Sequence, residues 1–111
     1  MDNLAKESCE PCKGDSPTVP EADWRPLLEQ LPEWEVVKED GVPMLQRKIG
    51  LDNFVEALEL ARKVGDLAES ESHHPRLIVE YGSLHVSWWT HAIGGLHRND
   101  FIMAARTDEL L

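Results

Sequence analysis

Apolar residues near the start of the chain recur at helical spacing. Four of them stand at i, i+3, i+4 and i+7, which predicts one apolar stripe on a short helix. These residues are Trp24, Leu27, Leu28 and Leu31. Residues 18–21 (Thr-Val-Pro-Glu) have the spacing of a capping box, whereas Pro26, which fits only in a first helical turn, favours a start nearer Asp23. Pro32 ends the element.

Two stretches of β-forming residues follow, at 34–38 and 42–49. They flank the turn sequence Glu-Asp-Gly at 39–41 and predict a β-hairpin. Pro43 lies near the start of the second stretch. Because proline cannot donate a backbone hydrogen bond, it indicates an edge position for that strand.

The strongest helical pattern in the chain follows Asp52, which is placed to cap it. Helical character is expected to end by about Ser72, because the residue before Pro75 is disfavoured in the α region. The predicted apolar stripe contains Phe54, Ala57, Leu58, Ala61, Val64, Gly65 and Ala68.

The last third of the chain alternates and then becomes helical again. Residues 77–81 and 84–90 predict two strands around a Gly-Ser turn. Either His97 or Asn99 opens a last helix, which places Asp100 in its first turn. On the second strand, one predicted face holds Leu84, Val86, Trp88 and Thr90, and the other holds His85, Ser87, Trp89 and His91.

The predicted order of elements is α-β-β-α-β-β-α. This alternation predicts an α+β fold, a four-stranded antiparallel sheet with helices packed on one face. The length of 111 residues suits one domain, expected over residues 18–111 after a flexible N-terminal arm at 1–17 that is mobile unless it docks. The sheet has two edges, and Trp89 would leave apolar area exposed on a monomer. We therefore expect a homo-oligomer.

The charge of the chain excludes several classes of partner. It carries 21 acidic and 11 basic residues, a formal net charge of −10. Such a chain repels phosphate backbones, because nucleic-acid affinity comes largely from Lys and Arg. There is no apolar run long enough for a membrane span and no signal-peptide pattern. We expect a cytoplasmic protein without direct nucleic-acid or membrane binding.

Cys9 and Cys12 have CxxC spacing. That spacing serves redox work, by lowering a thiol pKa, or supplies half of a zinc site. No strand–helix pattern and no second CxxC accompany it, and prolines surround it. The favoured interpretation is a pair of reduced thiols in a loose arm, with redox and metal roles as alternatives.

Three histidines are the main candidates for chemistry. His73 and His74 precede Pro75 just past a predicted helix end, and His91 ends a predicted strand before two glycines. Imidazole titrates near neutrality, so these side chains both donate and accept protons at cellular pH. We predict an acid–base enzyme that uses no bound cofactor and no metal. A metal site is the open alternative, disfavoured because adjacent histidines rarely bind one ion and no HxxxH occurs.

Other polar and aromatic residues have simpler interpretations. His85 and His97 are expected to be solvated surface histidines. Asp100 alone is a carboxylate favoured by a helix N-terminus, and Glu69 alone is a solvated helix residue. The tryptophan pair at 88–89 is interpreted as core plus interface rather than as a ligand platform.

Together, these residues form a longer pattern at fixed gaps that resembles the signature of the pterin-4a-carbinolamine dehydratases. The residues that carry the resemblance are Glu69, His73, His74, Pro75, Tyr81, His91 and Asp100. Residues 31–34 (Leu-Pro-Glu-Trp) and 94–101, which begin Gly-Gly-Leu and end Asn-Asp-Phe, are also similar to that family. The resemblance covers about residues 20–110.

The resemblance implies both a fold and a reaction. The implied fold is a four-stranded antiparallel sheet with helices on one side, in a homodimer or homotetramer. The implied reaction converts 4a-hydroxytetrahydropterin to quinonoid dihydropterin and water, and it recycles the tetrahydrobiopterin of aromatic amino acid hydroxylases. The implied catalytic residues are His73, His74 and His91, the implied substrate-binding residues are His73, His74, Pro75, Thr90, His91, Ala92 and Ile93, and the implied supporting residues are Glu69, Tyr81 and Asp100.

Two further functions stay open. Animal members of the family resemble dimerisation partners of a transcription factor, which makes a non-catalytic binding module of coactivator type the main alternative. A related pterin role, such as molybdenum-cofactor metabolism, would use the same fold and site. The intact set of three histidines favours the dehydratase.

Overall fold

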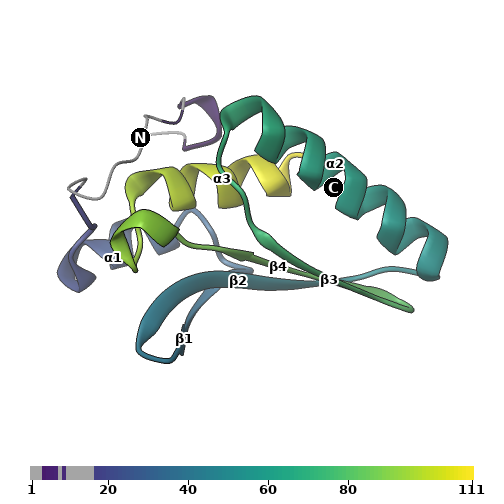
Figure 1. Ribbon diagram of the computed structural model, residues 1–111, viewed down its shortest axis with the longest axis horizontal. Helices are drawn as coiled ribbons and strands as arrows, with labels where there is room; N and C mark the ends of the chain where they lie inside the picture. The colour runs from purple at the N-terminus through teal and green to yellow at the C-terminus, as the bar shows by residue number, and fades with distance from the viewer. Residues whose placement is uncertain (1–3, 8, 10–16) are drawn as a thin grey trace.

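The computed structural model describes residues 4–7, 9 and 17–111. Figure 1 shows the arrangement of its helices, strands and 3-10 turns. The elements are η1 (Leu4–Lys6), η2 (Glu21–Asp23), α1 (Trp24–Leu28), β1 (Glu35–Glu39), β2 (Val42–Gly50), α2 (Phe54–Glu71), β3 (Arg76–Glu80), β4 (Ser83–Trp88), η3 (His91–Ile93) and α3 (Arg98–Asp108). None of the described helices combines the length and the apolar character that crossing a membrane requires.

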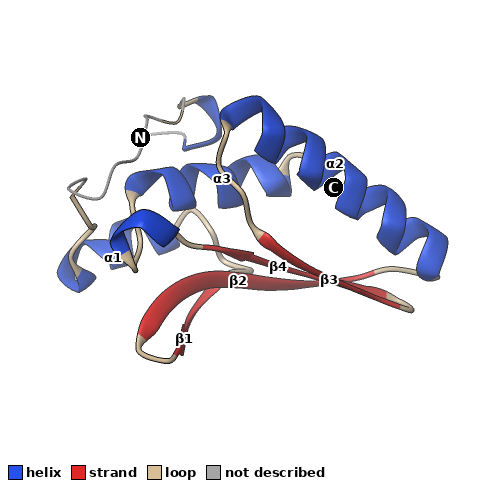
Figure 2. Ribbon diagram, viewed as in Figure 1, coloured by secondary structure: helices blue, strands red, loops and turns tan. Residues whose placement is uncertain are grey.

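The strands form a four-stranded antiparallel sheet in the order β1-β2-β4-β3. Helices α2 and α3 lie along one face of it, and no described element covers the opposite face (Figure 2). The predicted α+β fold, with helices on one side of the sheet, is confirmed.

Turn residues with positive φ close both hairpins. Asp40 (φ 51°) and Gly41 (φ 81°) form the loop between β1 and β2, and Gly82 (φ 79°) lies in the loop between β3 and β4. Positive φ at both central residues is the type I′ geometry that matches the twist of antiparallel strands.

The edge position expected from Pro43 is wrong, because β2 is a central strand. Proline is tolerated there because the two neighbours of β2 do not extend equally far. Pro43 pairs with β1, whereas β4 pairs with β2 only from Leu45 onward. The missing N–H therefore lies where β2 has one neighbour.

Helix α2 begins and ends close to its predicted positions. Its N-cap is Asn53 rather than Asp52, because the Asn53 side-chain oxygen accepts the Glu56 backbone N–H at 2.9 Å. At the other end, Ser72 adopts the left-handed conformation (φ 51°) and stops the helix. The His73 N–H then donates back to the Ala68 carbonyl at 3.1 Å, which completes a Schellman-type end.

The buried stripe of α2 is displaced from the predicted one. Phe54 and Leu58 are exposed, although the pattern placed them inside. The small residues Ala57 and Ala68 are buried as predicted. By helical periodicity alone, either Leu58 or Leu60 could lie beside them. Packing on the sheet selects the flank of Leu60. The buried residues are Ala57, Leu60, Val64 and Ala68.

Strand β4 and helix α3 form the centre of the core. The predicted inward face of β4 is buried at Leu84, Val86 and Trp88. Helix α3 is also buried along most of its length, at Asn99, Asp100, Phe101, Ile102, Met103, Ala104 and Thr107. Near its end, Asp108 Oδ1 accepts hydrogen bonds from the Trp34 indole at 2.9 Å and from Arg47 Nη1 at 2.6 Å. Asp108 thereby ties α3 to β2 and to the residue before β1.

The capping box expected at residues 18–21 does not form. The N-cap position of η2 is occupied by Pro20, and no side chain caps that turn. Thr18 stands too early to reach the first free N–H groups. A capping box forms instead at the start of α3, between His97 and Asp100.

Part of the arm expected at 1–17 docks on the domain. Leu4 is buried, and the Glu7 carboxylate accepts two hydrogen bonds from Arg98, at 2.8 and 2.7 Å. An apolar side chain and an ion pair thus hold Leu4–Glu7 against α3. Cys12 lies outside the described residues, so the interpretation of the CxxC motif stays a prediction.

Replacing Asp108 by Ala is expected to lower the free energy of unfolding by about 1–3 kcal/mol, because two partly buried donors lose their acceptor. Urea unfolding measures the change. The control is Glu109→Ala, an exposed position expected to change stability by less than about 0.5 kcal/mol. Equal effects of the two substitutions would contradict the assigned role of Asp108.

Candidate active site

The loop from α2 to β3 and the loop after β4 meet at one end of the sheet. Arg76 is the first residue of β3 and pairs with Ser87, the second-last residue of β4. The residues before Arg76 and after Ser87 therefore leave the sheet side by side. Helix α3 begins beneath them and supplies the carboxylate that joins the two loops.

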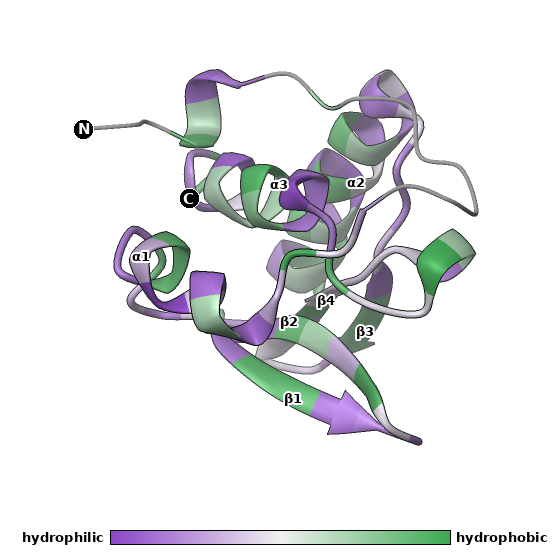
Figure 3. Ribbon diagram, turned by 90° about the vertical axis from the view of Figure 1, so that its left-hand side faces the viewer, coloured by the Kyte–Doolittle hydropathy of each residue, from purple (hydrophilic) through white to green (hydrophobic). Residues whose placement is uncertain are grey.

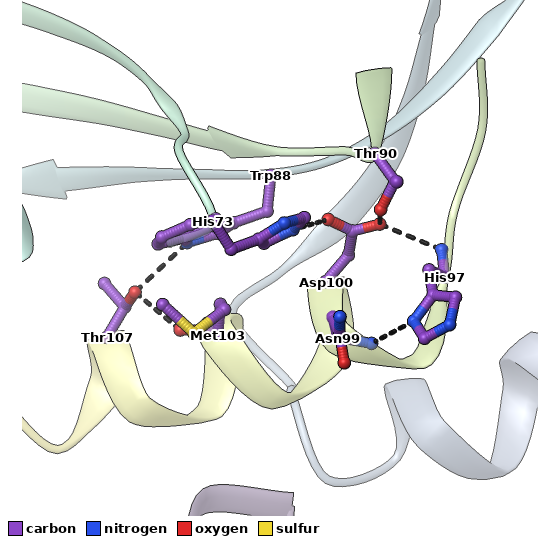
Figure 4. Close-up of polar contacts among 8 residues, drawn as sticks. All are labelled: His73, Trp88, Thr90, His97, Asn99, Asp100, Met103 and Thr107. Atoms are coloured by element: carbon purple, nitrogen blue, oxygen red, sulfur yellow. Dashed lines mark hydrogen bonds and ion pairs between the residues drawn. The ribbon is translucent and has the colours of Figure 1, made fainter. Parts of the chain in front are cut away.

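That carboxylate belongs to Asp100, which is fully buried. Its Oδ1 lies 2.6 Å from His73 Nε2, and its Oδ2 accepts the Thr90 hydroxyl at 2.7 Å and the His97 backbone N–H at 2.9 Å (Figure 4). Asp100 occupies the third position of α3, where the helix N-terminus and free N–H groups favour negative charge. One carboxylate thus links the end of α2, the end of β4 and the start of α3.

The His73 ring is held on its face as well as at its edge. It stacks on the indole of Trp88 with a centroid distance of 5.7 Å and an angle of 8° between the planes. The Trp88 Nε1–H donates to the Thr107 hydroxyl at 3.1 Å, and that hydroxyl donates to the Met103 carbonyl at 2.7 Å. Because each of these groups is buried and bonded, the ring has a defined orientation.

His74 lies at the exposed rim beside this buried network. Its side chain is 58% exposed, and its Nε2 lies 3.2 Å from Oε1 of Glu69, which is also exposed. Exposed pairs of this kind contribute little stability. The contact therefore orients the imidazole without fixing it.

His91 is also exposed and begins η3. Its ring packs on Trp89 with a centroid distance of 4.4 Å, and the Arg76 guanidinium lies 5.0 Å from the centre of the Trp89 ring. Arg76 in turn donates two hydrogen bonds to the Glu39 carboxylate, at 2.7 and 3.3 Å. These contacts run from the tip of the first hairpin to His91.

The predicted site residues do not all come together. His73 and Thr90 each contact Asp100. The same two loops also carry His74, Pro75, His91, Ala92 and Ile93. Tyr81 is not part of this group. It is exposed in the turn beyond the far end of β3, a five-residue strand that spans roughly 16 Å. Tyr81 is therefore too far away to contact the histidines or Asp100.

Thr90, which the family resemblance implies as a substrate-binding residue, lies on the inward face that the alternation predicted. It is buried, its hydroxyl donates to Asp100, and its backbone N–H and carbonyl bond to Gly95 at 2.8 and 3.4 Å. Thr90 holds the loop that carries His91, and its hydroxyl and backbone groups are bonded within the protein.

The expectation that His85 and His97 are solvated is also corrected. His97 is buried as the N-cap of α3, where its Nδ1 accepts the Asn99 N–H at 3.0 Å. His85 is half-buried on the open face of the sheet, with Nε2 at 3.1 Å from Glu80 Oε1 but without an aligned hydrogen bond. Both histidines lie in regular elements or at their caps, where neighbouring chain segments cover them.

Sequence reasoning missed the residues that support the histidines. Trp88 was expected in the core, but its stacking on His73 depends on the approach of two separate loops. Thr107 and Arg76 gave no signal, because their partners lie far away in the sequence. Among the described residues, no group of three or more His, Cys, Asp or Glu side chains is arranged to hold a metal ion.

Replacing Asp100 by Asn is expected to lower the free energy of unfolding by about 2–4 kcal/mol. The asparagine amide has the shape of the carboxylate, but its NH₂ group would face the hydrogen-bond donors of the residues around Asp100. Chemical unfolding of this variant is compared with Asp66→Asn, an exposed position on α2 expected to be neutral within about 0.5 kcal/mol. A loss at Asp100 no larger than that of the control would show that the buried carboxylate is dispensable.

The contact of Glu39 with Arg76 makes a prediction about pH. The hydrogen bonds and charge of Arg76 hold the pKa of Glu39 below its ordinary value of 4.5. The pair therefore favours the folded state above that pH, and its contribution is lost as the pH falls through the lowered pKa. In Arg76→Gln, a carboxyl-carbon NMR titration should return the Glu39 pKa toward its ordinary value. Glu7, whose pKa is lowered by Arg98, is the internal control and should not move.

Comparison with known proteins matches the sequence and the fold to one family. The family model for pterin 4 alpha carbinolamine dehydratase matches residues 17–110. A relative from Marinobacter nauticus is 53% identical over 110 residues, 99% of each chain, and one from Chlorobium luteolum is 52% identical over 99% of this chain and 96% of its own length. Both bear the provisional name pterin-4-alpha-carbinolamine dehydratase.

The fold is also that of a solved structure, the transcriptional coactivator/pterin dehydratase from Brucella melitensis. The TM-score is 0.76 at 24% identity, over 85% of this chain and 98% of that one. The structural match shows the fold, and the extent of the sequence match shows the family. The chain therefore belongs to the pterin 4 alpha carbinolamine dehydratase family.

Proposed function

We propose that the protein removes water from a 4a-hydroxytetrahydropterin to give quinonoid dihydropterin, by acid–base catalysis with histidines. Membership of a dehydratase family supports the reaction class. The single observation that carries the catalytic proposal is the His73–Asp100 pair, a 2.6 Å contact to a fully buried carboxylate next to two exposed histidines.

The reaction needs one proton to arrive and one to leave. The C4a–O bond breaks, and the hydroxyl departs as water after it has been protonated. The N5–H bond also breaks, and its electron pair forms the C4a=N5 double bond. The proton taken from N5 balances the proton given to the hydroxyl, so the enzyme needs one acid and one base of suitable pKa.

The hydrogen-bond pattern around Asp100 supports a role for His73 as the base. A carboxylate only accepts hydrogen bonds, so the ring hydrogen of neutral His73 lies on Nε2, toward Asp100. The second nitrogen, Nδ1, is then the acceptor that takes a proton. When it does so, the buried carboxylate stabilises the resulting imidazolium.

In this proposal, His74 protonates the leaving hydroxyl, and His91 assists from the far side of the pterin. Both are exposed, and each is oriented by a neighbour, Glu69 for His74 and Trp89 for His91. We propose that His74 forms the acid–base pair with His73 and that His91 assists. The backbone of His73–Pro75 and of His91–Ile93 would flank the flat heterocycle, and the chemistry needs neither a cofactor nor a metal.

The same proposal extends to the setting of the reaction. We propose a cytoplasmic homo-oligomer that recycles the tetrahydrobiopterin of an aromatic amino acid hydroxylase. Phe54, Val55 and Leu58 form an exposed apolar row on α2, which supports association with a second copy. The same row would suit a binding module, and the Brucella relative is named a coactivator as well as a dehydratase. A pterin of another pathway, such as molybdenum-cofactor metabolism, is a further alternative.

Replacing His74 by Ala is expected to lower turnover by roughly 10² or more, because it removes a proton-transfer group from an exposed rim that the fold does not need. Stopped-flow measurement of the loss of 4a-hydroxytetrahydropterin tests this expectation. His73→Ala and His91→Ala are measured in the same way, and circular dichroism checks each fold.

The matched control is His85→Gln, which alters a half-buried histidine on the open face of the sheet and should keep wild-type turnover. Unchanged dehydration in His74→Ala would refute the assignment. Capture of a protein partner by wild type that shows no dehydratase activity would favour the binding module instead.

A further inference from the structure

A hollow lies where α1 and the start of α3 approach each other. This end of the molecule is opposite to the turn between β3 and β4. Figure 1 shows this side at the left, and Figure 3 turns it toward the reader. Its volume is about 570 Å³, within the range of small-molecule sites. Its lining comes from residues 17–20, from η2 and α1, from Gln30 just after α1, and from His97 and Arg98. It contains none of the three predicted catalytic histidines, although the His97 backbone N–H also donates to Asp100.

The wall formed by residues 17–20 is anchored at Val19. The Val19 N–H donates to the Leu96 carbonyl at 2.8 Å, and the Val19 carbonyl accepts the Trp24 indole N–H at 2.8 Å. With Val19 fixed from both sides, Pro20 and Leu27 complete an apolar surface that exists before any ligand arrives. A preformed apolar wall lowers the cost of ordering a site on binding.

His97 is the most buried of the polar residues that line this mainly apolar hollow, the others being Thr18, Asp23, Gln30 and Arg98. His97 is only 6% exposed, and its Nδ1 accepts the Asn99 N–H at 3.0 Å. The ring hydrogen of neutral His97 therefore lies on Nε2. Figure 4 shows that the second ring nitrogen points away from Asn99, and within the described part of the chain that nitrogen has no hydrogen-bond partner. Because His97 Nε2 is not one of the fully buried side-chain atoms that lack a partner, it reaches solvent at the wall of the hollow, where a ligand oxygen can replace water as its acceptor.

The charges around the hollow select against ions. Arg98 is already neutralised by the two hydrogen bonds that it donates to Glu7. An anion would therefore find no unpaired cation at Arg98, and it would meet the exposed carboxylate of Asp23 at the rim. A cation would gain from Asp23 but would leave the His97 N–H without an acceptor.

We propose that this hollow is a second ligand site, which takes a neutral, mainly apolar molecule with a carbonyl oxygen that accepts from His97 Nε2–H. The site is independent of the proposed dehydratase function, since none of its residues belongs to the catalytic set. It provides one directed hydrogen bond in an apolar surround, a common composition of small-molecule pockets.

Three probes of one shape test the chemistry: benzamide, which is neutral with a carbonyl, benzoate, the anion, and benzylamine, the cation. Each is titrated into the full-length protein labelled with ¹⁵N. Benzamide is expected to give saturable shifts at the Val19, Leu27 and Asn99 amides and at His97 Nε2. Benzylamine is expected to bind about tenfold more weakly, because it leaves the His97 N–H without an acceptor. Benzoate is expected to bind more weakly because the Asp23 carboxylate at the rim repels it. Absence of saturable shifts with benzamide, or equal binding of all three, would overturn the proposal.

Two variants separate the hydrogen bond from simple apolar contact. His97→Asn keeps a side-chain oxygen that caps α3 but removes the donor aimed into the hollow, so benzamide should bind about tenfold more weakly while the fold persists. Asp23→Asn is exposed and does not depend on the cap. It should leave benzamide binding unchanged and strengthen benzoate binding. Unaltered affinities in both variants would contradict the assignment.

Discussion

The buried carboxylate of Asp100 is the interaction on which the rest of the structure depends. It accepts hydrogen bonds from the Thr90 hydroxyl and the His97 backbone, and it lies 2.6 Å from His73. A buried charge is stable only when its lone pairs are satisfied, so each partner must be held at its place. The ends of α2, β4 and α3 are therefore fixed relative to one another by one side chain.

This constraint explains why the site is rigid on one side and open on the other. His73 is enclosed between Trp88 and Asp100, whereas His74 and His91 lie at the surface with single, weak contacts. A rigid histidine with a defined tautomer and two adjustable histidines suit a reaction that moves one proton away and another toward the same flat substrate. Glu39 bonds to Arg76, Arg76 lies over the Trp89 ring, and Trp89 packs on His91. These contacts limit the movement of the His91 ring.

Local patterns in the sequence predicted the elements and the sheet well, since alternation and helical spacing depend on near neighbours. The displaced stripe of α2 and the central position of Pro43 were not predictable, because packing on other elements decides both. The histidine pair and Asp100 stood out by motif, yet the burial of His97 and the support of Trp88 by Thr107 follow only from tertiary contacts. Tyr81 shows the converse, a motif residue that the fold places far from the others.

The most direct test is a crystal structure of the protein with 7,8-dihydrobiopterin, a stable relative of the product. The pterin ring is expected between residues 73–75 and 91–93, with the N5 edge within hydrogen-bond distance of the His73 and His74 imidazoles. Asp100 should keep its three contacts in that complex. A ring bound elsewhere, or held without either imidazole, would contradict the proposal that these loops form one active site.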